Sequence, residues 1–327
     1  MHIPDGYLGP QTYATLYAAM APVWYLASKK VKEVFKARQV PLIALTSAFV
    51  FIIMMFNIPA PGGTSGHMVG GAVAAIILGP WAAVIAVSIA LVMQALIFGD
   101  GGITAIGANC FNMAFIMPFS GYYTYKFIKG SALPLSKRGA AAACIAGYIS
   151  LNLAALATAF ELGMQPMLAH SPDGRPLYAP YPLSVTIPVM AVEHLFLFGI
   201  VEAIGTGLIV SYICKMEQGF LYARENEKFK PLWAILLFIL LLTPLGLIAA
   251  GSAWGEWGSD KLNVMLGYVP EGLKNMENIW GAVLPGYNIS GWEKSPIKTI
   301  AGYIISAALG STVIVGIIYI TQNFLKR

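Results

Sequence analysis

The first two residues, Met1 and His2, carry three nitrogen atoms that can bind one metal ion together. They are the terminal amine, the His2 backbone amide once it is deprotonated, and the His2 imidazole, and they close fused chelate rings in one plane. A fourth nitrogen from His67 would complete a square, which suits Ni(II) or Cu(II) and not the tetrahedral preference of Zn(II). Met1, His2 and His67 are therefore a candidate metal site. The alternative is that the Met-His start is accidental and His67 is only a polar residue at a helix start.

A second motif overlaps the first. The stretch Gly63-Thr64-Ser65-Gly66 matches the GxSG pattern of intramembrane serine proteases, in which a serine at a helix start pairs with a histidine on another span. His194 could be the partner of Ser65. A Gly-Ser turn before a helix is more often only a cap, so this alternative is the weaker one.

Several ionisable residues fall inside or beside apolar segments, where such groups are costly and often functional. Glu193 and His194 are open to either a structural or a functional interpretation. Glu202 precedes the small residues of EAIGTG, which favours an interhelical hydrogen bond or a subunit contact. His170 lies in a polar loop, where we expect it to be solvated.

The composition indicates a polytopic membrane protein, because 57% of the residues are hydrophobic, 11% are charged and the mean hydropathy is +0.70. The three cysteines lie far apart in apolar stretches and suggest neither a disulfide framework nor a CxxC metal site. No G-x-x-x-x-G-K-[ST] phosphate-binding loop occurs in the chain. If transport is driven by ATP, another subunit must hydrolyse it.

We predict an all-α fold with about nine membrane segments, one of them the short stretch 67–78. The segments are expected near 10–28, 41–58, 67–78, 81–98, 104–127, 139–163, 184–214, 231–250 and 299–322. Most of the Lys and Arg then fall on one side of the membrane, which places the N-terminus outside and the C-terminus inside. The same topology puts Met1, His2, His67 and the long loop 251–297 outside.

Five stretches carry a family resemblance: MHIPDGYLGP at the start, FNIPAPGGTSGHMVGG at 56–71, LGPWAAV at 78–84, QALIFGDGGITAIGANCFNMAF at 94–115 and VEAIGTG at 201–207. Together they resemble the CbiM/NikM family, the substrate-binding S components of energy-coupling-factor (ECF) transporters for nickel and cobalt. Residues 231–327, with AWGEW and VPEGL in the outer loop, resemble the accessory NikN/CbiN component that some members carry fused. PEGL departs slightly from the PDGL that is usual there.

The resemblance implies three parts: a metal-binding S component at 1–215, a cytoplasmic linker at 216–230 and an accessory part at 231–327. It implies that Met1, His2 and His67 hold the metal in a square plane. It also implies that the chain is a transporter subunit and not an enzyme, with Ni(II) or Co(II) as substrate and no resident cofactor. Cobalt uptake for cobalamin synthesis remains the alternative to nickel.

The partners that the resemblance implies are a transmembrane coupling protein like NikQ or CbiQ and ATPase subunits like NikO or CbiO, in the plasma membrane of a prokaryote and without nucleic acid. The small-residue pair Ala44-xxx-Ala48 corresponds to a helix face that contacts the coupling protein in other S components.

Overall fold

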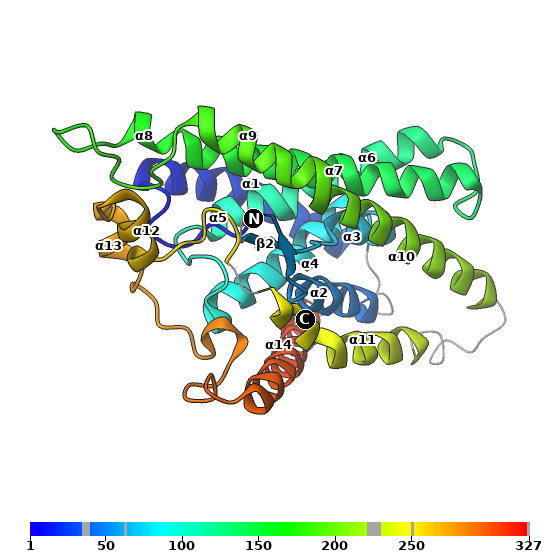
Figure 1. Ribbon diagram of the computed structural model, residues 1–327. Coiled ribbons are helices and arrows are strands. Elements are labelled where there is room, and N and C mark those ends of the chain that lie inside the picture. The colour runs from blue at the N-terminus through cyan, green and yellow to red at the C-terminus, as the bar shows by residue number, and fades with distance from the viewer. Residues whose placement is uncertain (35–39, 62–63, 221–229, 250–251, 326–327) are drawn as a thin grey trace.

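The computed structural model describes residues 1–34, 40–61, 64–220, 230–249 and 252–325, and these residues are mostly helical (Figure 1). Most of the linker predicted at 216–230 lies outside the described residues. The multi-pass helical architecture predicted from composition is confirmed: five helices are long and apolar enough to cross a membrane. These are Pro80–Phe98, Lys137–Leu168, Leu183–Met216, Lys230–Ile248 and Pro296–Thr321.

The described residues of the N-terminal part contain ten α-helices, three of which continue into π-helical turns. In chain order they are α1 (Pro10–Val34), α2 (Val40–Met54), α3 (Gly71–Leu78), α4 (Pro80–Met93) with the π-helical turn Gln94–Phe98, α5 (Ile106–Asn109), the π-helical turn Cys110–Ile116, α6 (Met117–Lys129), α7 (Lys137–Gly163), α8 (Gln165–Leu168), α9 (Leu183–Glu193) with the π-helical turn His194–Phe198, and α10 (Gly199–Phe220).

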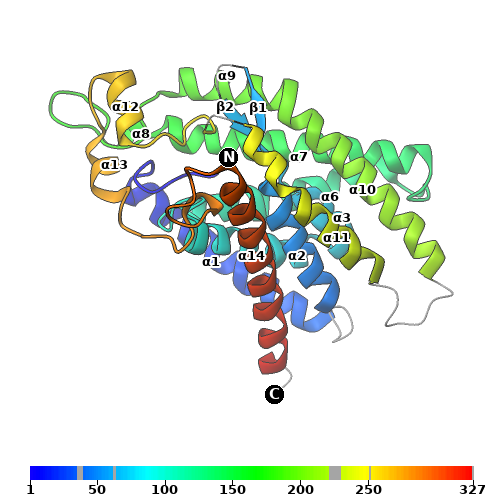
Figure 2. The same cartoon turned by 60° about the horizontal axis from the view of Figure 1, so that its bottom comes forward.

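The C-terminal part begins with α11 (Lys230–Leu242) and a 3-10 turn at Thr243–Ile248. The loop predicted outside the membrane is not structureless, because it holds α12 (Ser259–Leu266), α13 (Glu271–Met276) and a 3-10 turn at Pro285–Tyr287. The final helix α14 (Pro296–Leu325) packs along α2, as both views show (Figure 2).

The contact between α2 and α14 is close because α14 presents a glycine to a phenyl ring. A Cβ on Gly310 would lie 2.3 Å from the ring of Phe51, so a larger residue does not fit there. The Tyr303 hydroxyl donates to the Met55 carbonyl oxygen at 3.0 Å. Ala44 and Ala48 are both fully buried inside this chain. In this structure, therefore, the small-residue pair packs within the chain.

The count of nine segments stays a prediction, since helix length and composition support five spans among the described residues. Helix α3 has eight residues and is about 12 Å long, against a hydrocarbon core of roughly 30 Å. It does not cross the core by its own length.

The prediction of an all-α fold is wrong at one place. Two short strands, β1 (Ile58–Ala60) and β2 (Thr64–Gly66), pair in antiparallel fashion, and Ile58 pairs with Gly66. Proline at 59 and 61 disfavours a helix here. His67 follows directly after β2.

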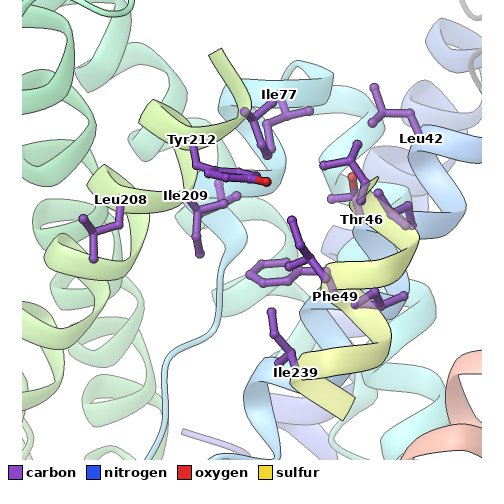
Figure 3. A pocket seen from close by; sticks show the side chains of 14 residues that line it. Leu42, Thr46, Phe49, Ile77, Leu208, Ile209, Tyr212 and Ile239 are labelled. Carbon is purple, nitrogen blue, oxygen red and sulfur yellow. The ribbon is translucent and has the colours of Figure 1, made fainter. Parts of the chain in front are cut away.

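An apolar cavity of about 510 Å³ lies between α2, α3, α10 and α11. Figure 3 shows Phe49 of α2, Tyr212 of α10 and Ile239 of α11 among the side chains that line it. None of its lining residues has a side-chain nitrogen or carboxylate, so the cavity is unsuited to a metal ion.

Candidate metal site

The N-terminal segment, residues 1–9, is threaded into the protein and is mostly buried. The Ile3 backbone N–H donates to Asn109 Oδ1 at 2.8 Å, and Asn109 Nδ2 donates back to the Ile3 carbonyl at 3.2 Å. The Gly102 N–H also donates to the Ile3 carbonyl at 2.9 Å. Hydrogen bonds with Gly102 and Asn109 thus fix the chain directly after His2.

The chain turns at Asp5 and Gly6, within the Pro4-Asp5-Gly6 tripeptide that is typical of turns. Asp5 accepts hydrogen bonds from the backbone N–H groups of Ile103 and Thr104 at 3.0 and 2.8 Å. Gly6 has φ +81°, and a Cβ there would lie 2.6 Å from the Leu273 backbone. Both the backbone angle and the close approach require glycine. The turn directs Met1 and His2 inward.

His2 and His67 lie side by side, as the candidate site requires. His67 Nε2 is 3.3 Å from His2 Nδ1, the ring centroids are 5.1 Å apart, and both residues are buried. With metal–nitrogen bonds of about 2 Å, neighbouring corners of a square plane lie roughly 2.8 Å apart. The two nitrogens therefore need to move by only about half an ångström to bind one ion. His2 Nδ1 is also the ring nitrogen that closes a small chelate ring with its own amide.

The hydrogen bond on the other side of the His67 ring settles which nitrogen can bind a metal. His67 Nδ1 is 3.1 Å from the Met68 carbonyl oxygen, which can only accept. The ring proton therefore belongs on Nδ1, and Nε2 presents its lone pair to His2.

Glu202 of α10 holds the backbone that follows His67. Its carboxylate is fully buried and accepts from the N–H groups of Val69 at 2.8 Å and Gly70 at 3.1 Å. These N–H groups precede α3, so the carboxylate also lies at the positive end of that helix. Glu202 is a hydrogen-bonding residue, as expected, but its partners lie in the loop that follows His67 and not in another helix.

Two acidic residues face the N-terminal nitrogens. Asp100 Oδ1 is 3.1 Å from His2 Nδ1, and Glu256 Oε1 is 3.6 Å from the Met1 amine. Burial, followed by the charge of the terminal amine, lowers the pKa of His2 to about 3, so its ring is neutral at neutral pH. The Asp100 contact is therefore a hydrogen bond from a neutral ring. A metal ion bound at Nδ1 would take the place of that proton.

Glu256 comes from the C-terminal part and forms an ion pair with the Met1 amine, one of the main-chain nitrogens of the candidate chelate. Burial raises the pKa of Glu256 to about 7, and the terminal amine opposes this shift. The adjacent Trp257 carbonyl accepts from the Tyr7 hydroxyl at 2.7 Å, which anchors the N-terminal segment against the same loop.

Sequence reasoning missed the acidic residues of the site. Asp100 and Glu256 lie in stretches that carry the family resemblance, but their sequence offered no reason to single out these two carboxylates. The one signal was topological, because the loop 251–297, which contains Glu256, was expected outside the membrane with Met1 and His67.

The other candidate residues have different surroundings. His170 is exposed, as expected, in a loop that bridges to Pro176. His194 is buried, and its Nδ1 lies 2.8 Å from the Met190 carbonyl oxygen of its own helix. Glu193 is half-buried, and Ser65 is buried in β2. Neither His170 nor His194 is hydrogen-bonded to Met1, His2 or His67 in the part of the chain that the structure describes.

The described residues contain no group of three or more His, Cys, Asp and Glu side chains placed to hold a metal ion. A site made of two imidazoles and two main-chain nitrogens does not belong to that class. What the arrangement offers chemically is two imidazole nitrogens 3.3 Å apart, buried beside the chain terminus that carries the Met1 amine and the His2 amide.

Two protein families match consecutive parts of this chain. The family described as "Cobalt uptake substrate-specific transmembrane region", CbiM, matches residues 2–219. The PDGLE domain matches residues 230–327.

Relatives of known name match nearly the full length. The fused nickel transport protein NikMN of Rhodobacter capsulatus is 43% identical over 96% of this chain and 95% of its own length. The probable fused nickel transport protein LarMN of Lactiplantibacillus plantarum is 43% identical over 94% of this chain and 93% of its own. A solved structure described as a transition metal transporter is 53% identical, with a TM-score of 0.63, and covers 67% of this chain and 94% of its own.

Replacement of Glu202 tests whether it holds the His67 loop. Glu202→Leu leaves two buried N–H groups without an acceptor, at a cost of about 1–3 kcal/mol each. We expect a lower melting temperature in detergent and weaker nickel binding, with Glu202→Gln intermediate because it keeps one acceptor oxygen. Glu193→Gln on the preceding helix is the control and should change neither. A Glu202→Leu protein with unchanged melting and nickel affinity would contradict this role.

Proposed function

This chain belongs to the CbiM family and carries a C-terminal PDGLE domain, and from that membership we propose that it captures Ni(II) on the outer face of the membrane for uptake into the cell. The metal is held in a square plane by the Met1 amine, the His2 amide nitrogen, His2 Nδ1 and His67 Nε2. In this proposal the chain is a binding and translocation subunit, and the ion is its substrate.

The observation that carries this proposal is the 3.3 Å approach of His67 Nε2 to His2 Nδ1 in a buried site formed by the chain terminus. The terminal amine and the His2 amide lie in the same residue pair, so four nitrogens are available without any rearrangement of the fold. Planar nitrogen donors favour Ni(II) and low-spin Co(II) over Zn(II).

Cobalt uptake by the same mechanism is the alternative. The relatives that match nearly the full length are named as nickel transport proteins. A cobalt transport protein CbiM of Acetohalobium arabaticum matches 39% of this chain at 37% identity. The full-length matches favour nickel.

Energy for transport comes, in this proposal, from ATP hydrolysed by partner subunits of an ECF complex, since the chain has no phosphate-binding loop of its own. The S component is at 1–215, the linker at 216–230 and the accessory part at 231–327. Nine membrane segments place the N-terminus outside, in the plasma membrane of a prokaryote. The intramembrane protease alternative with Ser65 and His194 gains no support from relatives that are named as transport proteins.

If the Met1 amine binds the metal, it must be unmodified and must lie directly before His2. One residue added before Met1 moves the amine away from His2 and should abolish nickel binding with the fold intact. His2→Ala and His67→Ala should do the same, because each removes an imidazole donor. Equilibrium nickel titration of purified protein measures the effect, and exposed His170→Ala is the matched control. Full-affinity binding by the extended protein would contradict the proposed ligands.

Nickel affinity should fall steeply with acid. The amine and the amide each lose a proton when the metal binds, so the apparent affinity should drop by about 100-fold per pH unit where both are protonated. The His2 ring should not contribute near neutral pH, because burial lowers its pKa to about 3. Titrations at several pH values check the slope, and a flat profile would exclude the main-chain ligands.

Reconstitution separates an ATP-driven subunit from a channel. Vesicles that contain this chain alone should not accumulate nickel, and addition of the coupling protein, the ATPase subunits and ATP should start uptake. Accumulation by the chain alone, driven by the metal gradient, would show that no ATPase is needed.

A further inference from the structure

Two buried polar atoms beside the proposed metal ligands have no hydrogen-bond partner among the residues that the structure describes: His2 Nε2 and Gln94 Oε1. Both residues are almost fully buried, and an unpaired buried polar group is costly. The two side chains also share one carboxylate, because Asp100 Oδ1 is 3.1 Å from His2 Nδ1 and Asp100 Oδ2 accepts from Gln94 Nε2 at 3.4 Å. His2 Nε2 and Gln94 Oε1 are therefore a candidate hydrogen-bond pair.

The hydrogen bonds of the Gln94 amide group fix which end faces His2. Gln94 Nε2 donates to the Tyr287 hydroxyl oxygen at 3.0 Å and to Asp100 Oδ2 at 3.4 Å. The Tyr287 hydroxyl itself donates to Asp100 Oδ2. A carboxylate only accepts, so the NH₂ end of Gln94 must face this pair. The side-chain carbonyl oxygen of Gln94, Oε1, therefore faces away from Tyr287 and Asp100.

Binding of a metal ion at His2 Nδ1 decides where the ring proton goes. A neutral imidazole that binds a metal through one nitrogen carries its proton on the other. With Nδ1 on the metal, Nε2 becomes an N–H donor in a buried site. Gln94 Oε1 can then accept a hydrogen bond from this N–H, which gives each of the two unpaired atoms a partner.

Tyr287 is held in place firmly enough to orient Gln94. Its ring stacks on Phe98 with centroids 4.8 Å apart and an interplanar angle of 21°. Its φ of +60° is unusual for an aromatic residue, which indicates that the surrounding structure enforces this conformation. Gln94 sits where α4 changes to a π-helical turn, a feature that is frequent at functional sites.

From these contacts we propose that Gln94 is a positioning residue for the metal site: its carbonyl accepts the Nε2–H of His2, and Tyr287 of the C-terminal part holds it in that orientation. The pair locks the His2 ring with Nδ1 toward the metal. The C-terminal part thus contributes to metal affinity without providing a ligand. This inference rests on the proposed function, since it takes His2 Nδ1 as a metal ligand.

Three variants with a native N-terminus test the proposal, with Ni(II) as the probe. Gln94→Met removes the amide at similar size and should weaken nickel binding by about 10–100-fold, the usual cost of losing such a partner. Tyr287→Phe removes only the hydroxyl and should weaken binding less. Tyr303→Phe is the matched control, because its hydroxyl donates to the Met55 carbonyl and not to this network, and it should bind like the wild type.

The second readout is the His2 Nε2–H proton itself. Square-planar low-spin Ni(II) is diamagnetic, so NMR of nickel-loaded protein with ¹⁵N-labelled histidine can follow this proton. It should exchange slowly with water in the wild type and in Tyr303→Phe, and fast in Gln94→Met and Tyr287→Phe.

Gln94→Met with wild-type affinity, or with weak binding but a still protected proton, would overturn the proposal. If Gln94→Met does not fold, Tyr287→Phe is the deciding variant. The same nickel affinity and the same exchange rate of the His2 proton in Tyr287→Phe and Tyr303→Phe would overturn the role of Gln94 and Tyr287. Failure of the wild type itself to bind nickel with the spectrum of a planar site would instead contradict the proposed function.

Discussion

The burial of the chain terminus is the constraint on which the rest of this structure depends. Ordering a residue costs roughly 1–2 kcal/mol of backbone entropy, and a terminus has a neighbour on one side only. Here the cost is offset by the Asn109 bonds to Ile3, by the Asp5 bonds to the 103–104 backbone and by the Tyr7 bond to Trp257. For the proposed metal site this burial is preorganisation, since it places the nitrogens of Met1 and His2 before any ion binds.

The two parts of the chain meet at this terminus. The N-terminal part supplies the nitrogens, and Glu202 of α10 fixes the loop that carries His67. The C-terminal part supplies Glu256 against the Met1 amine and Tyr287 against Asp100 and Gln94. The fused partner is therefore part of the surroundings of the candidate site, although it is separated from Met1 by most of the sequence.

Local chemistry made the candidate ligands and the turn after them predictable. A Met-His start, a Pro-Asp-Gly tripeptide and a histidine after a Gly-rich stretch each have a meaning within a few residues. The hydrogen-bonded surroundings were not predictable in this way, because Asp100 and Tyr287 meet across 187 positions of sequence. The same limit applies to the membrane segments: apolar length predicts the long helices, but it cannot decide how a short helix such as α3 sits in the bilayer.

X-ray absorption at the nickel edge, on protein that is loaded with Ni(II) and keeps its native terminus, tests the proposed planar site most directly. We predict a square-planar edge spectrum, a single shell of four nitrogen neighbours and the scattering pattern of two imidazole rings. A six-coordinate shell, sulfur neighbours, or a single imidazole would contradict a site built from Met1, His2 and His67.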